Sequence, residues 1–261
     1  MYHRINDTIA PSDLIIAPEK FKEQMWYLKK FCDVISLQDV CDIYVQKKEM
    51  KRRRRPHIVI TLDDGYYDNY QNAYPILKKF KLPATIFLVT GFIDTGKKML
   101  YYENMSTPDM LNWEEVRRMK DSGITFCPHT ETHPHLRELS RLEQAAEIKN
   151  SMYTLVKNIS AGREARIFSY TYGEYNEVTL DVLRELGVKL AVTVNGGINT
   201  LNDKPLELRR LTADGRDDLV DFMRKLAPDV DPVWQYRFNV FKQSRIGRMA
   251  EAAKRLIRRI I

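Results

Sequence analysis

Short apolar runs rich in β-branched residues alternate along this chain with segments whose apolar residues recur at helical spacing. The predicted strands occupy residues 33–37, 57–62, 84–90, 124–127, 166–170, 188–194 and 206–211. The predicted helices follow Leu37, include Tyr74 to Phe80, and cover roughly residues 112–121, 140–158, 176–186 and 216–226. Strands that alternate with helices predict a parallel sheet in an α/β fold. About seven such units favour a barrel, complete or incomplete.

Length and composition agree with one catalytic domain. A chain of 261 residues suits a single α/β barrel. Its 44% hydrophobic and 30% charged residues are typical of a folded globular protein. We expect a catalytic domain over residues 1–228 and a basic extension over residues 229–261. The three cysteines lie too far apart for a disulfide framework or a cysteine zinc site.

No targeting segment is expected. The N-terminus lacks the basic start and apolar stretch of a secretory signal. The longest apolar runs, such as Ile86–Val89, are far shorter than a membrane span. The sequence as written predicts a cytoplasmic protein, or an exported one if a segment precedes it. It carries no signal for an oligomeric state.

Two pairs of polar residues follow predicted strands and carry the candidate chemistry. Asp63 and Asp64 end the run at 57–62, and His129 and His133 follow the run at 124–127. A hydrolytic metal needs about three protein ligands and an open position for water. One aspartate and two histidines supply that set and leave one aspartate as a base. Either pair alone is commonly a turn or a surface feature, but together they favour a metal-dependent hydrolase.

Three segments carry a family resemblance. Thr61–Gly65 (Thr-Leu-Asp-Asp-Gly) resembles the first motif of the polysaccharide deacetylases (carbohydrate esterase family four, the NodB homology domain). His129–Leu136 resembles the second motif, and Phe168–Gly173 resembles the third. In the third motif Ser169 and Thr171 replace the usual arginine and proline. The resemblance runs from residue 2 to about residue 226 and implies a single-domain, distorted (β/α)7-type barrel.

The resemblance also implies roles for individual residues. Asp64, His129 and His133 match the ligands of a divalent metal, with Zn²⁺ as the default, although this ligand set also accepts other divalent ions. Asp63 matches the general base, and the backbone N–H of Tyr172 matches the oxyanion donor. Thr130 matches a residue that orients the loop of the two histidines. The implied reaction removes N- or O-acetyl groups from a carbohydrate, in particular an N-acetylhexosamine glycan.

The general acid needs separate consideration. The chain has no histidine after His135, so the late histidine of most family members is absent. Its opening, Met1-Tyr2-His3-Arg4-Ile5, resembles that of the poly-N-acetylglucosamine deacetylase branch, in which an N-terminal histidine takes this place. We therefore expect His3 to be the acid. The alternative is a frayed terminus.

Two more residues are expected near the substrate. Arg210 resembles an arginine of the same branch that can hold Asp63, because Ser169 cannot. Trp113 can line a sugar site together with Tyr172. The alternatives are an exposed arginine at a strand end and a tryptophan in the core or at a helix cap.

Basic residues gather at the C-terminal end. Residues 237–261 contain eight Lys or Arg against one Glu, so their net charge of +7 equals that of the whole chain. Apolar residues at helical spacing accompany them. Such a helix can lie on an anionic membrane, or it can pack on the domain with its basic face in water. The basic run at 51–55 is expected to be a solvated loop, and no nucleic-acid recognition module accompanies it.

Two other functional classes stay open. One is a catalytically impaired relative that binds glycan, because the third motif departs from the family pattern. The other is a metal amidohydrolase acting on a non-sugar amide, since a barrel and its ligands define chemistry rather than substrate.

Overall fold

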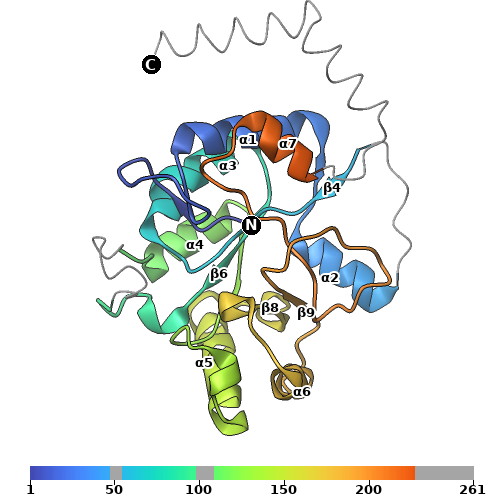
Figure 1. The fold of residues 1–261 in the computed structure, drawn as a ribbon. Coiled ribbons are helices and arrows are strands. Elements are labelled where there is room, and N and C mark those ends of the chain that lie inside the picture. The colour runs from blue at the N-terminus through green and yellow to red at the C-terminus, as the bar shows by residue number, and fades with distance from the viewer. Residues whose placement is uncertain (48–54, 98–108, 227–261) are drawn as a thin grey trace, which may run out of the picture. The chain divides into compact units, whose positions relative to one another are not determined.

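The computed structural model describes residues 1–47, 55–97 and 109–226 (Figure 1). The chain divides into two compact units, Met1–Phe222 and Met223–Ile261. The first unit carries the fold described below, whereas the expected basic extension at 229–261 and most of the run at 51–55 lie outside the described residues. Among the described helices, none has the length and hydropathy needed to cross a membrane.

Parallel strands form small sheets in the first unit. They are β1 (Arg4–Ile5) with β2 (Ile15–Ile16), β3 (Asp33–Val34) with β4 (His57–Ile58), β5 (Thr61–Leu62) with β6 (Ala84–Leu88) and β7 (Ile124–Pro128), and β8 (Ile167–Ser169) with β9 (Leu190–Val192). All these pairings are parallel, which confirms the prediction from alternation. The predicted strand at 206–211 is reduced to one bridge between Val192 and Leu208.

Helices lie around the strands (Figure 1). They are α1 (Pro18–Phe31), α2 (Leu37–Gln46), α3 (Tyr74–Phe80), α4 (Trp113–Asp121), α5 (Arg141–Ile159), α6 (Glu177–Glu185) and α7 (Leu219–Leu226). Short turns include the π-helical η1 (Asn69–Ala73) and the 3₁₀-helical η2 (Thr90–Phe92), η3 (Leu136–Glu138), η4 (Glu164–Arg166) and η5 (Thr171–Gly173). Four of the α-helices, α2, α4, α5 and α6, begin with a capping box. These boxes satisfy the first backbone N–H groups and define where the helices begin.

The strands follow a curved path that does not close in the part of the chain described. Backbone hydrogen bonds join Tyr2 to Thr61 and Asp63 on β5. On the other side, the N–H of Ala213 donates to the carbonyl oxygen of Met1 at 3.0 Å. Between β7 and β8, however, no backbone hydrogen bond occurs among the described residues. The α/β class is therefore confirmed. The predicted closed (β/α)7-type barrel is not confirmed, because backbone pairing between β7 and β8 is missing among the described residues.

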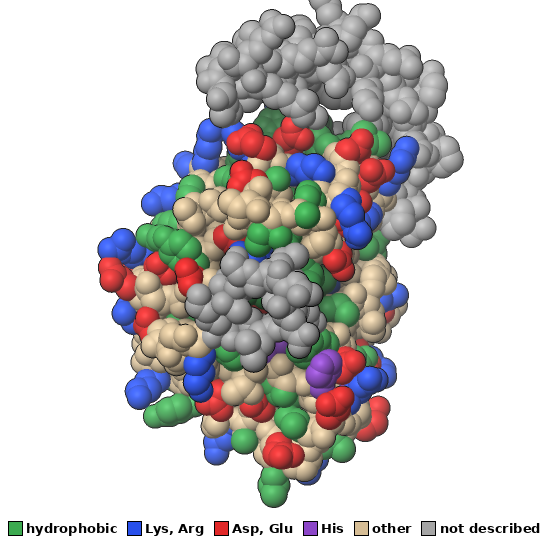
Figure 2. Space-filling view, turned by 60° about the vertical axis from the view of Figure 1, so that its left-hand side comes forward, with side chains coloured by type: hydrophobic (Ala, Val, Ile, Leu, Met, Phe, Trp, Pro, Cys, Tyr) green, Lys and Arg blue, Asp and Glu red, His purple; other side chains and the backbone are tan. Residues whose placement is uncertain are grey.

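An apolar cluster fills the interior beneath the strand ends. Its members are Leu37, Cys41, Phe87, Cys127, Ile167, Leu190, Val192 and Leu208. Cys127 is fully buried in it, as expected for a packing residue. The outer surface is mixed in charge: Figure 2 shows acidic and basic side chains interspersed over the face drawn. The carboxyl ends of β5, β7 and β8 remain available for chemistry, as in other parallel α/β folds.

Candidate active site

The two adjacent aspartates lie in a sharp turn after β5. Asp64 has a φ of 74° and Gly65 a φ of 84°, both in the left-handed region. A Cβ at position 65 would lie 2.5 Å from the Leu88 side chain, and together with the left-handed φ this contact favours glycine here. Asp63 and Asp64 are both buried. The turn allows the two neighbouring carboxylates to meet different partners.

The two histidines lie on one loop after β7. His129 is buried, and the N–H of His133 donates to the side-chain hydroxyl of Thr130 at 3.0 Å. Thr130 and His133 both have a φ of 62°, which is uncommon for residues other than glycine. The hydroxyl of Thr130 thus ties the loop to itself, as expected for an orienting residue.

Asp64, His129 and His133 converge. The Nε2 atoms of His129 and His133 each lie 3.4 Å from Oδ1 of Asp64. A tetrahedral ion with bonds of about 2.0–2.1 Å separates its ligand atoms by about 3.4 Å. Within the described residues, these three side chains form the group able to hold a metal ion, with its ligand atoms inside 4.8 Å of one another. The residues therefore fit a divalent metal.

Hydrogen bonds keep the Asp64 carboxyl ionised, which suits this ligand set to a cation. Burial would raise the pKa of the Asp64 carboxyl, but hydrogen bonds with His129 and His133 lower it well below its usual value. Nδ1 of His129 lies 2.8 Å from the carbonyl oxygen of Ser169. Because a carbonyl only accepts, Nδ1 carries a proton, which leaves Nε2 as the atom that faces Asp64 and that would bind a metal.

The partner of Asp63 is Arg210. Its Nη1 and Nη2 atoms donate to Oδ1 and Oδ2 of Asp63, both at 2.7 Å, and its Nε donates to the carbonyl of Thr193 at 2.7 Å. Burial would raise the pKa of Asp63, but the charge and hydrogen bonds of Arg210 lower it to about 2. Arg210 is 6% exposed. It is therefore not an exposed arginine at a strand end, and its guanidinium is occupied by Asp63.

His3 lies directly before strand β1, in the N-terminal segment of the chain. Tyr2 pairs with Leu62, so the strand runs beside the turn that carries both aspartates. Nδ1 of His3 is buried without a hydrogen-bond partner among the described residues. Burial lowers the pKa of His3, and the carboxylates of Asp64 and Asp63 oppose this effect only in part. The frayed-terminus alternative therefore fails, whereas the role of His3 as an acid stays a prediction.

The Tyr172 side chain packs on the histidine loop. Its ring stacks on His135 with centroids 3.8 Å apart and meets the edge of His133 at 4.6 Å. The backbone of Tyr172 has a φ of 56°, a left-handed conformation at the end of β8. Nδ1 of His135 also lies 3.1 Å from Oε2 of Glu174. The oxyanion role of the Tyr172 N–H stays a prediction.

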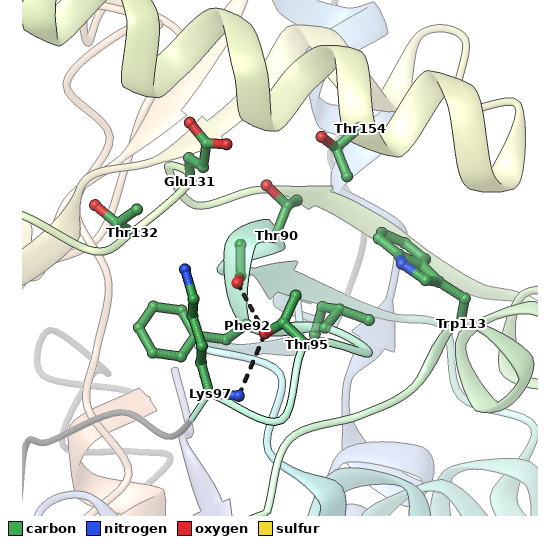
Figure 3. Close-up of a pocket in the computed structure, with 10 residues that line it drawn as sticks. Thr90, Phe92, Thr95, Lys97, Trp113, Glu131, Thr132 and Thr154 are labelled. Carbon is green, nitrogen blue, oxygen red and sulfur yellow. Dashed lines mark hydrogen bonds between the residues drawn. The ribbon is translucent and has the colours of Figure 1, made fainter.

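Trp113 lies apart from the triad formed by the metal-ligand candidates Asp64, His129 and His133. It begins α4, is 9% exposed, and its N–H donates to Asp94 at 3.0 Å. Its ring borders a cavity of about 540 Å³ between the η2 turn and α5 (Figure 3). The residues that line this cavity include Thr90, Glu131, Thr132 and Thr154, but none of the three metal-ligand candidates. A cap and packing role therefore describes Trp113 better than contact with the reacting sugar.

Polar residues outside the three motifs hold the N-terminal segment in place. Asp68 binds Nε of Arg4 at 2.9 Å and the N–H of Ile5 at 3.2 Å. Asn69 donates to the carbonyl of His3 at 2.8 Å. The available signal was polar residues at 68, 69 and 72 in an aromatic-rich segment, which alone does not identify a partner.

Comparison with known proteins agrees with this geometry. The model of the family described as "Polysaccharide deacetylase" matches residues 50–191, more than half of the 261-residue chain. The protein YxkH of Bacillus subtilis is 29% identical over 212 residues, covering 81% of this chain and 69% of YxkH. A poly-beta-1,6-N-acetyl-D-glucosamine N-deacetylase of Staphylococcus aureus is 28% identical over 207 residues, covering 75% of this chain and 67% of that protein.

A solved structure shows the same fold. The deacetylase PplD of Streptococcus pyogenes, in complex with acetate, superimposes with a TM-score of 0.73 at 27% sequence identity. The match covers 87% of this chain and 96% of PplD.

Proposed function

The chain belongs to the polysaccharide deacetylase family, and on that premise we propose that it is a metal-dependent hydrolase that removes N-acetyl groups from an N-acetylhexosamine glycan. The observation that carries this proposal is the convergence of Asp64, His129 and His133 beside an aspartate that Arg210 keeps ionised. The triad fits a metal, and the second aspartate is occupied by Arg210 rather than drawn into the ligand set. The proposed ion is Zn²⁺.

The protein's own residues supply the proton transfers. When bound, the metal would act as a Lewis acid that lowers the pKa of water and polarises the amide carbonyl. Asp63 accepts the proton of the attacking water at its carboxylate. Arg210 holds both oxygens of Asp63, so the base is ionised and fixed in orientation before substrate arrives.

Completing the reaction needs an acid and an oxyanion donor. His3 donates a proton to the leaving nitrogen, which otherwise departs as an unfavourable amide anion. The backbone N–H of Tyr172 donates to the carbonyl oxygen as it gains negative charge. The left-handed turn at Tyr172 and Gly173 sets the direction of this N–H relative to the histidine loop. For the fold we propose the distorted (β/α)7 barrel, in which the N-terminal segment lies between β5 and Ala213.

The glycan is proposed from the relatives. The Staphylococcus aureus relative is named for poly-beta-1,6-N-acetyl-D-glucosamine, which supports a related β-linked glucosamine polymer as substrate. A non-catalytic glycan-binding relative is less well supported, because the triad and the Asp63–Arg210 pair are both complete.

A substrate panel tests the proposal. We expect acetate release from N-acetylglucosamine oligomers, with slower release from O-acetylated sugars and no hydrolysis of small cyclic amides. Asp63→Asn serves as the inactive control, because it removes the base and leaves the metal ligands in place. Hydrolysis of the cyclic amides in preference to the oligomers would support the amidohydrolase alternative instead.

A further inference from the structure

One carboxylate from α5 binds the loop between the two histidines. Oε2 of Glu147 accepts hydrogen bonds from the backbone N–H groups of Glu131 and Thr132, both at 2.9 Å. Oε1 of Glu147 accepts a third bond from the Thr132 hydroxyl at 2.6 Å. Charge-assisted hydrogen bonds of this kind are stronger than neutral ones. Glu147 is therefore the partner of two consecutive backbone donors in this loop.

The loop needs outside support because its backbone is unfavourable. Thr130 and His133 flank the two residues that Glu147 binds, and both have left-handed φ values of 62°. Such conformations persist when their surroundings fix them. The N–H groups of Thr90 and Gly91 bind the carbonyl oxygens of Thr130 and Glu131 at 3.3 and 2.8 Å. Glu147 supplies the complementary acceptors for the N–H groups.

The helix that carries Glu147 is a firm support. Helix α5 spans 19 residues and begins with a capping box. Ile148, the next residue, is fully buried in the core. Gln144, one turn earlier, is buried and accepts a hydrogen bond from the Thr179 hydroxyl at 2.7 Å. The position of Glu147 is thus set by the core and not by the loop that it holds.

We propose that Glu147 is a positioning residue that fixes the histidine loop, so that His129 and His133 face Asp64 before a metal binds. This inference rests on the proposed metal site and extends it to a residue outside the family motifs. Groups that orient metal ligands typically change metal affinity by about 10–100-fold when removed. The reason is that a loop without this support must be ordered at the moment of binding.

Two substitutions separate hydrogen bonding from charge. Glu147→Ala removes all three bonds to the loop. Glu147→Gln can keep them, because its amide oxygen can accept both N–H groups and its NH₂ can donate to the Thr132 hydroxyl. The matched control is Glu185→Ala, which removes an exposed carboxylate that binds Arg141 on the same helix. It leaves the histidine loop untouched.

Zinc titration of the metal-free full-length protein by calorimetry is the test. We expect Glu147→Ala to bind zinc about 10–100-fold more weakly than wild type. Glu147→Gln and Glu185→Ala should bind close to wild type. Wild-type affinity in Glu147→Ala would overturn the proposal. An equal loss in the Ala and Gln variants would also overturn it, because charge and not loop geometry would then be the cause.

A second measurement keeps this inference separate from the proposed function. Failure of the wild-type protein to bind zinc would count against the metal site itself. Amide hydrogen exchange at Glu131 and Thr132 then tests the contact without a metal. We expect exchange to be faster in Glu147→Ala than in wild type, and unchanged exchange would overturn the proposal. If Glu147→Ala does not fold, Thr132→Val removes one of the three bonds and should show a smaller loss in both measurements.

Discussion

At the scale of single residues, Asp63 depends on one guanidinium for its ionisation. Burial alone would raise the pKa of this carboxyl, and Arg210 instead brings it to about 2. A general base works only when deprotonated, so activity is lost as the pH falls through this pKa. In Arg210→Gln the burial remains and the positive charge is gone. We therefore expect the acid limb of the kcat/KM profile to move to higher pH.

The profile should be measured on protein whose melting temperature confirms folding, because removing a buried charge partner is destabilising. Asp63→Asn is the companion variant. Its kcat should fall by roughly 10²–10⁴-fold, the usual contribution of a general base, while its bound metal stays. An unshifted acid limb in Arg210→Gln, or metal loss in Asp63→Asn, would contradict these assignments.

As the proposed general acid, His3 should determine the alkaline limb of the pH–rate profile. An acid must be protonated, so the rate it supports falls as the pH rises through its pKa, which burial lowers in this protein. We expect His3→Ala to keep metal and fold and to lose roughly 10²–10⁴-fold in kcat, together with the alkaline limb. His57→Ala is a suitable control, because His57 starts β4 at the far end of the strand path from Asp63. Retention of the alkaline limb in His3→Ala would assign the acid to another group.

The metal triad could be predicted from the residues themselves, whereas the pairing of Asp63 with Arg210 was expected only through the family resemblance. Asp64 and His129 both follow strands, and parallel strands bring their carboxyl ends to one edge. Arg210 is separated from Asp63 by 147 residues, so no local sequence pattern links the two. Apolar spacing likewise does not show which side of a helix start faces the site, so the sequence left Trp113 open between a sugar site and a core or cap position.

At the scale of elements, the N-terminal strand is held by the π-helical turn η1. Asn69 donates to the carbonyl of His3, and Asn72 donates to that of Ile5 at 2.7 Å. Asp68 binds Arg4 and the N–H of Ile5 between them. π-helical turns often occur at functional sites. This one fixes the backbone at the candidate acid and at Ile5, two residues after it.

Asn69→Ala should therefore act on turnover through His3. A displacement of about 1 Å can cost about 100-fold in rate, so we expect kcat to fall by about 10–100-fold while zinc affinity stays. Asn72→Ala is the control, since its contact is two residues beyond His3. If kcat falls only as much as the fraction of folded protein falls, Asn69 has a structural role alone.

Helices could be predicted where a capping residue precedes a long segment with apolar residues at helical spacing. Helices α4, α5 and α6 lie where apolar spacing placed them, and each begins at a capping box. Helix α1 was not predicted, although Phe21, Met25 and Leu28 recur at helical spacing. Strands β1 and β2 have two residues each, too few to show a period. Closure of the sheet depends on pairing between distant segments and cannot be inferred from any one of them.

At the scale of the whole molecule, charge separates the chain into two parts. Residues 237–261 carry +7 and the rest is formally neutral. If the basic segment binds anionic lipid, the full chain should sediment with phosphatidylserine vesicles, and a chain ending at residue 236 should not. The shortened chain should keep its melting temperature and activity, because Met1–Phe222 is a compact unit. A sharply lower melting temperature would show instead that the segment packs against the domain.

The central claim is that Asp64, His129 and His133 hold the metal that makes this chain a deacetylase. Its most direct test measures bound metal and acetate release from N-acetylglucosamine oligomers on the same samples of wild type and His129→Ala. We predict a single divalent ion per wild-type chain, activity that chelation abolishes and zinc restores, and loss of both metal and acetate release in His129→Ala. Full metal occupancy and an undiminished rate in His129→Ala would contradict the account.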